Sequence, residues 1–373
     1  MTIKNTVLTL LFSFLTCLAV QAGPLKVFIL AGQSNMQGHA TIPTLQHLAM
    51  DPNYQYLLDK IENRDGSAKV YDKVQIAYLS GSGGKDNYKP IERKGALTAG
   101  YGATSGKIGP ELTFGIKMFE ELHEPILLIK TAWGGKSLNT DFRSPSAGDN
   151  PIEKRRDETG FFYRQMFEYV KKVLSDPSQY HPDYDANEGF EIAGFVWFQG
   201  FNDKVDKSAY PGNDRSIYTD LLAHFIRDVR KDFNAPDMPF VIGVIGTLGK
   251  VEDMRKIYDW KGIDKWFSDI EAFRKSMAAP AEMPEFKANV AAVYTENYLD
   301  PEIGWMEHAH KNYSKKLEGL SKEEKAAKMK EKFSERELEV LRVGKSNKGF
   351  HYFGSGKFFA LVGEAFAEAM LEL

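Results

Sequence analysis

Short runs of apolar, β-branched and aromatic residues recur at wide spacing along the chain. Six runs have the length and composition of buried strands, at residues 25–31, 74–79, 126–131, 192–198, 240–245 and 290–295. Between them, apolar residues recur at helical spacing at residues 111–122, 161–174, 217–233 and 264–277. Strands that alternate with helices of this length predict a parallel sheet covered on both faces. We therefore expect an α/β fold, a three-layer α/β/α sandwich.

The end of the chain carries the clearest helical pattern. Ser355 can cap a helix, and one face of that helix would carry Phe358, Leu361, Val362, Ala365, Phe366, Ala369 and Met370. This apolar face predicts that the C-terminal helix packs onto the sheet.

Two stretches interrupt the alternation of strands and helices. Residues 80–107 are rich in Gly, Lys and Tyr without a clear period, which predicts a surface loop bordering a pocket. Residues 313–342 mix both signs of charge at helical spacing, which favours one or two solvated helices over a partner-binding surface. We expect residues 23–373 to form a single domain that contains both insertions.

The first 22 residues have the pattern of a signal peptide. Lys4 precedes an apolar run from Thr6 to Val20, and Ala22 ends it with the small residue that a signal peptidase reads. The run is shorter than the roughly 20 residues of a comfortable membrane span. We expect cleavage after Ala22 and a secreted or periplasmic protein with no membrane attachment.

Charge and cysteine content exclude several classes of function. The net charge of −3 gives no long-range field for nucleic acid or an anionic membrane. The only cysteine is Cys17, inside the signal peptide, and Thr16 before it does not fit a lipoprotein signal. The mature chain would therefore have no disulfide, no thiolate nucleophile and no cysteine-based zinc site.

Polar motifs follow three of the predicted strands, and ligands bind at the carboxyl ends of parallel strands. Gly32-Gln33-Ser34-Asn35-Met36 comes directly after the first strand. A serine at a strand-to-helix turn has a free backbone N–H and the positive end of a helix dipole beneath it. These are conditions for a nucleophile, although an N-cap serine would give the same pattern.

The second and third motifs offer hydrogen-bond donors. Trp133-Gly134-Gly135 follows the strand that ends at residue 131, and a glycine N–H there could point at an oxyanion. Gln199-Gly200-Phe201-Asn202-Asp203 follows the strand that ends at residue 198, and the Asn202 amide would be a further donor. A plain turn and an Asx turn are the alternative interpretations.

A late histidine is the candidate base. His351 lies just before the C-terminal helix, and an imidazole can take a serine proton near neutral pH. The other histidines are rivals by residue type alone. His308 and His310 with Glu307 could suggest a metal site, but their spacing does not fit one face of a helix, so we expect surface histidines and no metal.

Together the four blocks resemble those of SGNH hydrolases. Two of the motifs are similar to those of the sialate O-acetylesterase and acetylxylan esterase branch: Ala31-Gly32-Gln33-Ser34-Asn35-Met36 and Trp197-Phe198-Gln199-Gly200. The resemblance implies a flavodoxin-like fold, Ser34 as nucleophile, His351 as base and no cofactor. It also implies an oxyanion hole from the N–H of Ser34, the N–H of Gly134 or Gly135, and the Asn202 amide. We place four flanking residues beside the substrate: Gln33, Trp133, Gln199 and Tyr352.

The orienting acid is missing from its usual places. The family usually has an aspartate three residues before the histidine, where this chain has Lys348, and some members have a glutamate where it has Phe201. Three carboxylates near strand ends are candidates, with Asp203 the first choice over Glu296 and Asp300. A backbone carbonyl could serve instead, giving a serine–histidine dyad. A positive charge on Lys348 would lower the histidine pKa.

The sequence thus predicts a secreted serine esterase that removes O-acetyl groups from carbohydrate, with acetylated carbohydrate as its partner. The main alternative is an inactive carbohydrate-binding protein on the same scaffold, with Trp133, Trp197 and Tyr352 as stacking platforms. A third interpretation is an esterase that acts on lipid or sulfate esters. The polar residues of the loops disfavour a lipid substrate, which needs a broad apolar groove.

Overall fold

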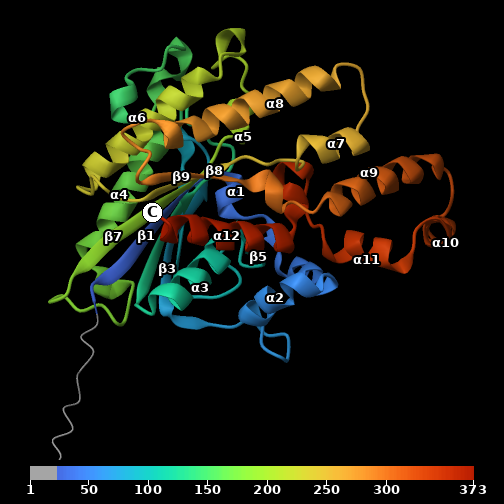
Figure 1. Cartoon of the computed structure of the whole chain (residues 1–373), viewed down its shortest axis with the longest axis horizontal. Helices are drawn as coiled ribbons and strands as arrows, with labels where there is room; N and C mark the ends of the chain where they lie inside the picture. Colours follow the sequence, from blue (N-terminus) through green and yellow to red (C-terminus); the bar gives the residue numbers. More distant parts are fainter. Residues whose placement is uncertain (1–22) are drawn as a thin grey trace, which may run out of the picture.

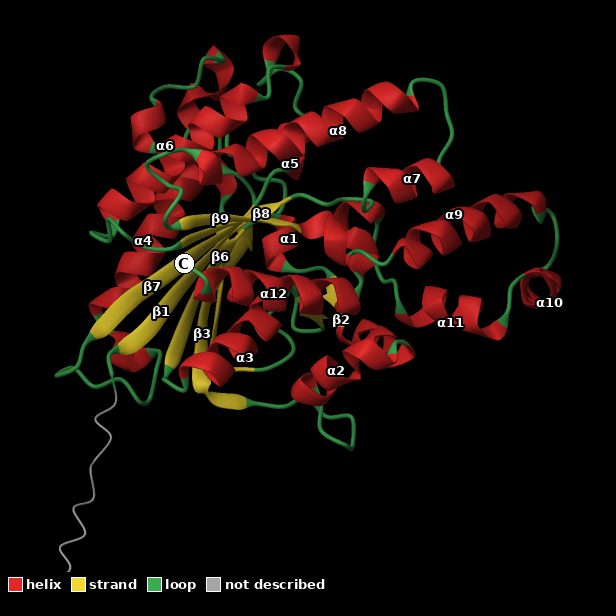
Figure 2. Ribbon diagram, viewed as in Figure 1, coloured by secondary structure: helices red, strands yellow, loops and turns green. Residues whose placement is uncertain are grey.

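A seven-stranded sheet forms the centre of the computed structural model, which describes residues 23–373 (Figures 1 and 2). The predicted signal peptide and Cys17 lie outside the described residues. The strand order is β4-β3-β6-β1-β7-β8-β9, and β4 alone runs antiparallel to its neighbour. The strands are β1 (Leu25–Gly32), β3 (Tyr71–Ser82), β4 (Lys89–Leu97), β6 (Ile126–Ala132), β7 (Phe190–Phe198), β8 (Phe240–Val244) and β9 (Val290–Tyr294). All six predicted strands are confirmed.

Helices cover both faces of this sheet. One face packs against α2 (Gln55–Ile61), α3 (Glu111–Leu122) and α12 (Gly356–Leu371), the other against α4 (Phe161–Ser175), α6 (Ser216–Asp232) and α8 (Ile263–Ala278). Successive β1 side chains alternate between the two cores, Phe28 and Leu30 toward one, Val27 and Ile29 toward the other. The predicted three-layer sandwich is confirmed.

Strand β1 lies in the middle of the sheet, paired with β6 on one side and β7 on the other. In the flavodoxin order the first strand lies between the second and the third. Here β1 lies between the third and fourth parallel strands of the chain, so the order differs in that detail. The chain still reaches both sides of β1, which places its carboxyl end where ligands bind in such sheets.

The C-terminal helix α12 forms as its pattern predicts. The Ser355 hydroxyl accepts a hydrogen bond from the Phe358 N–H at 3.3 Å, which caps the helix. The helix lies against α3 and the ends of β8 and β9. Its predicted apolar face is buried, with Ala369 only partly so.

The prediction of a surface loop at residues 80–107 is wrong, because the segment contains strand β4. β4 pairs antiparallel with β3 at the edge of the sheet, where Lys and Pro residues discourage further pairing. Those residues hid the alternating pattern of a strand. The guanidinium of Arg93 lies 4.8 Å from the centre of the Tyr78 ring and donates to the Gly100 carbonyl, which folds the following loop back onto the strand.

The charged insertion is helical, as predicted. Residues 313–342 contain the end of α9 (Pro301–Lys316), all of α10 (Lys322–Lys332) and most of α11 (Glu335–Val343). Figure 1 shows these helices at one end of the molecule, beyond α12. No side chain of α10 is buried.

The remaining elements are short. They are α1 (Ser34–Gln37), α5 (Phe201–Val205), α7 (Val251–Ile257) and the small antiparallel pair of β2 (Ala40–Thr41) and β5 (Lys107–Ile108). Among residues 23–373, no helix has the length and apolar character needed to cross a bilayer.

A buried ion pair supports the turn that follows β1. Lys130 on β6 is fully buried and donates to Glu111 at 2.7 Å and to the carbonyl of Gln37, the last residue of α1, at 2.9 Å. Burial lowers the pKa of Lys130 to about 8, and the Glu111 carboxylate opposes that shift. Glu111 also accepts the Gly109 N–H at 2.9 Å. Lys130 therefore joins α1 to the core.

Loss of this pair should destabilise the protein strongly. We expect Lys130→Met to lower the free energy of unfolding by about 3–5 kcal/mol, because the buried Glu111 charge loses its partner. Urea unfolding measures the loss. Lys117→Met is the control, since it breaks the exposed pair with Glu121 and should change stability little. Equal effects of the two substitutions would contradict the role given to Lys130.

Candidate active site

The three motifs that follow strands begin at the same height in the sheet, at the carboxyl ends of neighbouring strands. In the sheet, Gly32 at the end of β1 pairs with Ala132 on β6 and with Phe198 on β7. A side chain at Gly32 would collide with β7, because its Cβ would lie 2.2 Å from the Phe198 oxygen. The glycine thus lets the strands approach at the point where α1 begins.

Ser34 is the first residue of α1 and is 8% exposed. In that position its N–H has no partner inside the helix. Gly134 lies beside it, since a Cβ placed on Gly134 would be 4.0 Å from the Cβ of Ser34. The Ser34 hydroxyl makes no hydrogen bond within residues 23–373 and is free to react.

Gln33 ties the β1 and β7 loops together. Its Oε1 accepts from the Gln199 amide at 3.1 Å, the Gly200 N–H at 3.2 Å and the Asn202 N–H at 3.3 Å. Its Nε2 donates to Asn202 Oδ1 at 3.0 Å. Gln33 and Gln199 are each 1% exposed, so the predicted contact of these two side chains with substrate is wrong. Their amides instead fix the loops that carry the donors.

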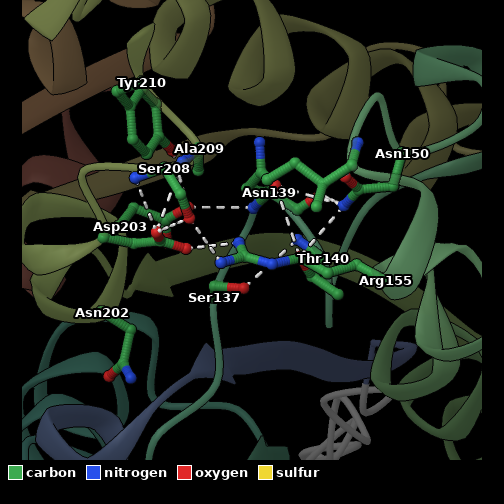
Figure 3. Close-up of polar contacts among 12 residues, drawn as sticks. Ser137, Asn139, Thr140, Asn150, Arg155, Asn202, Asp203, Ser208, Ala209 and Tyr210 are labelled. Atoms are coloured by element: carbon green, nitrogen blue, oxygen red, sulfur yellow. Dashed lines mark hydrogen bonds and ion pairs between the residues drawn. The ribbon is translucent and has the colours of Figure 1, made fainter.

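The candidate oxyanion donors converge on the same rim. The Nδ2 of Asn202 donates to the Gly135 carbonyl at 2.9 Å, which leaves its second amide hydrogen available. The N–H groups of Gly134 and Gly135 donate to no residue of the described chain. Figure 3 shows the Asn202 side chain pointing away from the polar cluster around Asp203.

Asp203, our first choice for the orienting acid, makes its hydrogen bonds away from His351. The carboxylate is fully buried and accepts hydrogen bonds from four groups: the Leu138 N–H at 2.8 Å, the Asn139 N–H at 2.9 Å, the Gln199 amide at 2.6 Å and the Tyr210 hydroxyl at 2.6 Å. Burial raises its pKa, and these hydrogen bonds counteract the rise. Asp203 therefore fastens the loop after β6 to α5 and makes no contact with His351.

The other candidate carboxylates are also engaged elsewhere. Glu296 lies 3.6 Å from Arg274, and Asp300 pairs with Lys357 at 2.9 Å. Phe201, at the position where some relatives have the acid, packs its ring 5.7 Å from that of Phe350.

His351 lies in a tight segment, Gly349–Gly354, that contacts α1. The Asn35 amide donates to the Phe350 carbonyl at 3.4 Å, which joins the Ser34 turn to the histidine segment. The His351 ring stacks on His39 with 4.1 Å between centroids, and its Nδ1 lies 3.1 Å from Asn347 Oδ1. No hydrogen bond links His351 to Ser34 in the described chain. The two segments meet, but the proton-sharing contact is not formed.

The environment keeps both stacked imidazoles neutral. Burial lowers the pKa of His351 to about 4, and the positive charge of Lys107 lowers it further. Burial, His351 and Lys107 lower the pKa of His39 to about 3. The Lys107 ammonium lies 3.3 Å from His39 Nδ1, which must accept because an ammonium only donates. The cation near the ring is thus Lys107, whereas the sequence pointed to Lys348.

The predicted aromatic platforms are buried. Trp133 is 1% exposed, and Trp197 and Tyr352 are fully buried. The Tyr352 hydroxyl accepts the Gly246 N–H at 2.9 Å, and its ring stacks on Phe358 at 3.7 Å. These side chains build the core beneath the site, so their prediction as sugar-stacking surfaces is wrong.

Sequence reasoning missed three residues around the imidazole: His39, Lys107 and Asn347. His39 lies close to Ser34 in the sequence, but its stacking on His351 depends on tertiary packing. Asn347 had a usable signal, because it is an amide four residues before the histidine in a chain that lacks the usual acid.

One family model matches the chain. The family model described as carbohydrate esterase, sialic acid-specific acetylesterase matches residues 24–269. No curated protein matches the sequence.

Three solved structures are similar at low identity. A protein from Arabidopsis thaliana is 16% identical, with 93% of this chain and 98% of that one covered and a TM-score of 0.48. A carbohydrate acetylesterase from Xanthomonas citri is 15% identical, with coverage of 72% and 49% and a TM-score of 0.38. NanS is 13% identical, with coverage of 74% and 78% and a TM-score of 0.40.

The low histidine pKa can be measured directly. We expect the His351 ring to titrate near pH 4 in an NMR titration, because burial and Lys107 both disfavour the charged imidazolium. Lys107→Met should raise the midpoint by removing the nearby charge. Lys311→Met removes the same charge from α9, at a lysine that does not affect the pKa of His351, and should leave the midpoint unaltered. A midpoint near the ordinary value of about 6.5 would contradict this environment.

Proposed function

The chain belongs to the carbohydrate esterase family of sialic acid-specific acetylesterases, and on that premise we propose that it is a secreted serine esterase that removes O-acetyl groups from carbohydrate. The family makes it a carboxylic ester hydrolase. The signal-peptide pattern of residues 1–22 supports export to the periplasm or beyond. The sugar is a sialate or an acetylated polysaccharide.

One observation supports the serine mechanism: a free hydroxyl, free N–H donors and a neutral imidazole lie on neighbouring segments of the chain, joined by the contact of Asn35 with Phe350. The level pairing of Gly32 with Ala132 and Phe198 supports a common site for Ser34, Gly134 and Asn202. The contact of Asn35 with Phe350 supports the approach of His351. Hydrogen bonds between catalytic groups are often long without substrate and tighten when it binds.

In the proposed reaction, Ser34 Oγ attacks the acetyl carbonyl while His351 takes its proton. The resulting oxyanion would accept from the Ser34 N–H, a Gly134 or Gly135 N–H and the Asn202 amide, each worth about 3 kcal/mol of transition-state stabilisation. His351 then returns the proton to the leaving sugar hydroxyl. Water, activated by the same imidazole, releases acetate from Ser34.

A groove that includes residues of α5 supports a sugar substrate over a lipid. Its volume is about 880 Å³, and its lining includes Lys204, Lys207, Lys265 and Trp260. Trp260 is 43% exposed, so its aromatic ring is accessible in a groove that Lys207 and Lys265 also line. Sugar rings stack on such faces and bond to polar neighbours, whereas a lipid chain needs a broad apolar groove.

The hydrolysis of 4-nitrophenyl acetate by the chain 23–373 tests the proposal. Ser34→Ala should reduce the rate at least about a thousandfold, because it removes the nucleophile. Circular dichroism would establish that the variant remains folded. Ser82→Ala, an exposed serine at the end of β3, is the matched control and should keep full activity.

Unchanged hydrolysis in Ser34→Ala would end the serine-esterase proposal. The missing acid favours one rival, an inactive carbohydrate-binding protein. No turnover by the unmodified chain, together with calorimetric binding of an acetylated oligosaccharide, would support that rival instead.

A further inference from the structure

The proposed reaction needs a group that orients the His351 ring. In serine hydrolases a carboxylate on Nδ1 holds the imidazole in the tautomer whose Nε2 can accept the serine proton. None of the three candidate carboxylates contacts His351, and the two positions usual for the acid hold Lys348 and Phe201. The neighbour of Nδ1 is the side chain of Asn347.

The contacts of Asn347 fix which end of its amide faces the ring. Its Oδ1 accepts the backbone N–H of Lys348 at 2.8 Å and lies 3.1 Å from His351 Nδ1. A backbone N–H only donates, so the atom between the two groups must be the oxygen. An amide oxygen only accepts, so Nδ1 must carry the ring proton. The ring is then a neutral Nδ1–H tautomer with its Nε2 lone pair free.

The backbone holds Asn347 and His351 in one rigid turn. The N–H groups of Ser346 and Asn347 both donate to the Phe353 carbonyl, at 2.8 and 2.7 Å, and the His351 N–H donates to Lys348 O at 2.9 Å. Tyr352 and Phe353 have φ values of 50° and 57°, in the left-handed region that such side chains rarely adopt. Such backbone strain persists only where the surroundings enforce it.

Burial of Tyr352 provides that enforcement. Its hydroxyl bonds to Gly246 and Thr295, and its ring stacks on Phe358 of α12. His39 covers one face of the His351 ring. Three contacts therefore position the imidazole. The buried Tyr352 fixes the backbone next to it, His39 stacks on one face of the ring, and Asn347 lies against Nδ1.

We propose that Asn347 is the positioning residue of the His351 base, so that the chain uses serine, histidine and asparagine where relatives use serine, histidine and an acid. The inference rests on the proposed function. A neutral amide fixes the tautomer but adds no negative charge to stabilise the imidazolium. The titratable groups near the ring are His39, which is neutral, and Lys107, whose positive charge disfavours protonation of His351. The base is thus oriented without being made more basic.

Two substitutions separate orientation from charge. Asn347→Ala removes the acceptor, and we expect kcat on 4-nitrophenyl acetate to fall about a hundredfold or more with KM little changed, because the tautomer is no longer fixed. Asn347→Asp keeps the acceptor and adds a charge. It should retain activity while moving the acidic limb of the pH profile of kcat/KM upward by about one to three pH units.

A matched control exists on α9. Asn312 also bonds to a histidine, with its Nδ2 2.8 Å from His308 Nε2. Asn312→Ala breaks an asparagine–histidine contact that does not involve His351 and should leave kcat and the pH profile unchanged. Effects at Asn347 with none at Asn312 would support a role specific to His351.

An NMR measurement separates this inference from the proposed activity. Two-bond ¹H–¹⁵N spectra of the unmodified chain should show His351 as the Nδ1–H tautomer, and Asn347→Ala should give a mixture. An Nε2–H tautomer in the unmodified chain would overturn the role of Asn347, whether or not the protein is an esterase. So would unchanged kcat and pH profile in both Asn347 variants while Ser34→Ala is inactive. Full activity in Ser34→Ala would instead refute the proposed function itself.

Discussion

The end of strand β1 is the constraint on which the site depends. β1 is buried on both faces and paired on both edges, so its carboxyl end is fixed by the whole sheet. Gly32 allows β1 and β7 to approach so closely that the next residues turn directly into α1. Ser34, the first residue of α1, is therefore fixed at the carboxyl end of β1. Lys130 binds the carbonyl at the other end of the same short helix, so the turn that carries Ser34 is held by the core at both ends.

The polar groups of the site are divided between structural and reactive tasks. The buried amides and carboxylate of Gln33, Gln199 and Asp203 satisfy one another and the loop backbones. Since a buried polar group without a partner is costly, this network leaves little freedom for loop movement. The groups of these loops without a partner in residues 23–373 include the Ser34 hydroxyl, the N–H groups of Gly134 and Gly135, and the buried Oδ1 of Asn35. The low pKa of His351 keeps its imidazole neutral beside these groups.

Much of the fold was predictable from the chain, because buried strands and amphipathic helices have clear periods. Glu111–Leu122 was predicted to the residue, and the Ser355 cap was found from its residue type. Strand β4 was missed because an edge strand can be rich in charge and proline. For the site, spacing placed Ser34 and Asn202 after strands, but it could not reveal how side chains pair. Asp203 has the residue type of an orienting acid, and only its four hydrogen-bond donors show that it supports a loop. Trp133 and Tyr352 flank the motifs in sequence and yet point into the core.

Covalent labelling tests the central claim most directly, that Ser34 is a nucleophile activated by His351. An organophosphonate ester would be incubated with the chain, which is then digested with trypsin and analysed by mass spectrometry. Ser34 is the only serine in the tryptic peptide 27–60. Our account predicts one phosphonyl group on that peptide, with labelling at least about a hundredfold slower in His351→Ala. An unlabelled peptide 27–60, or labelling at the same rate without the imidazole, would contradict it.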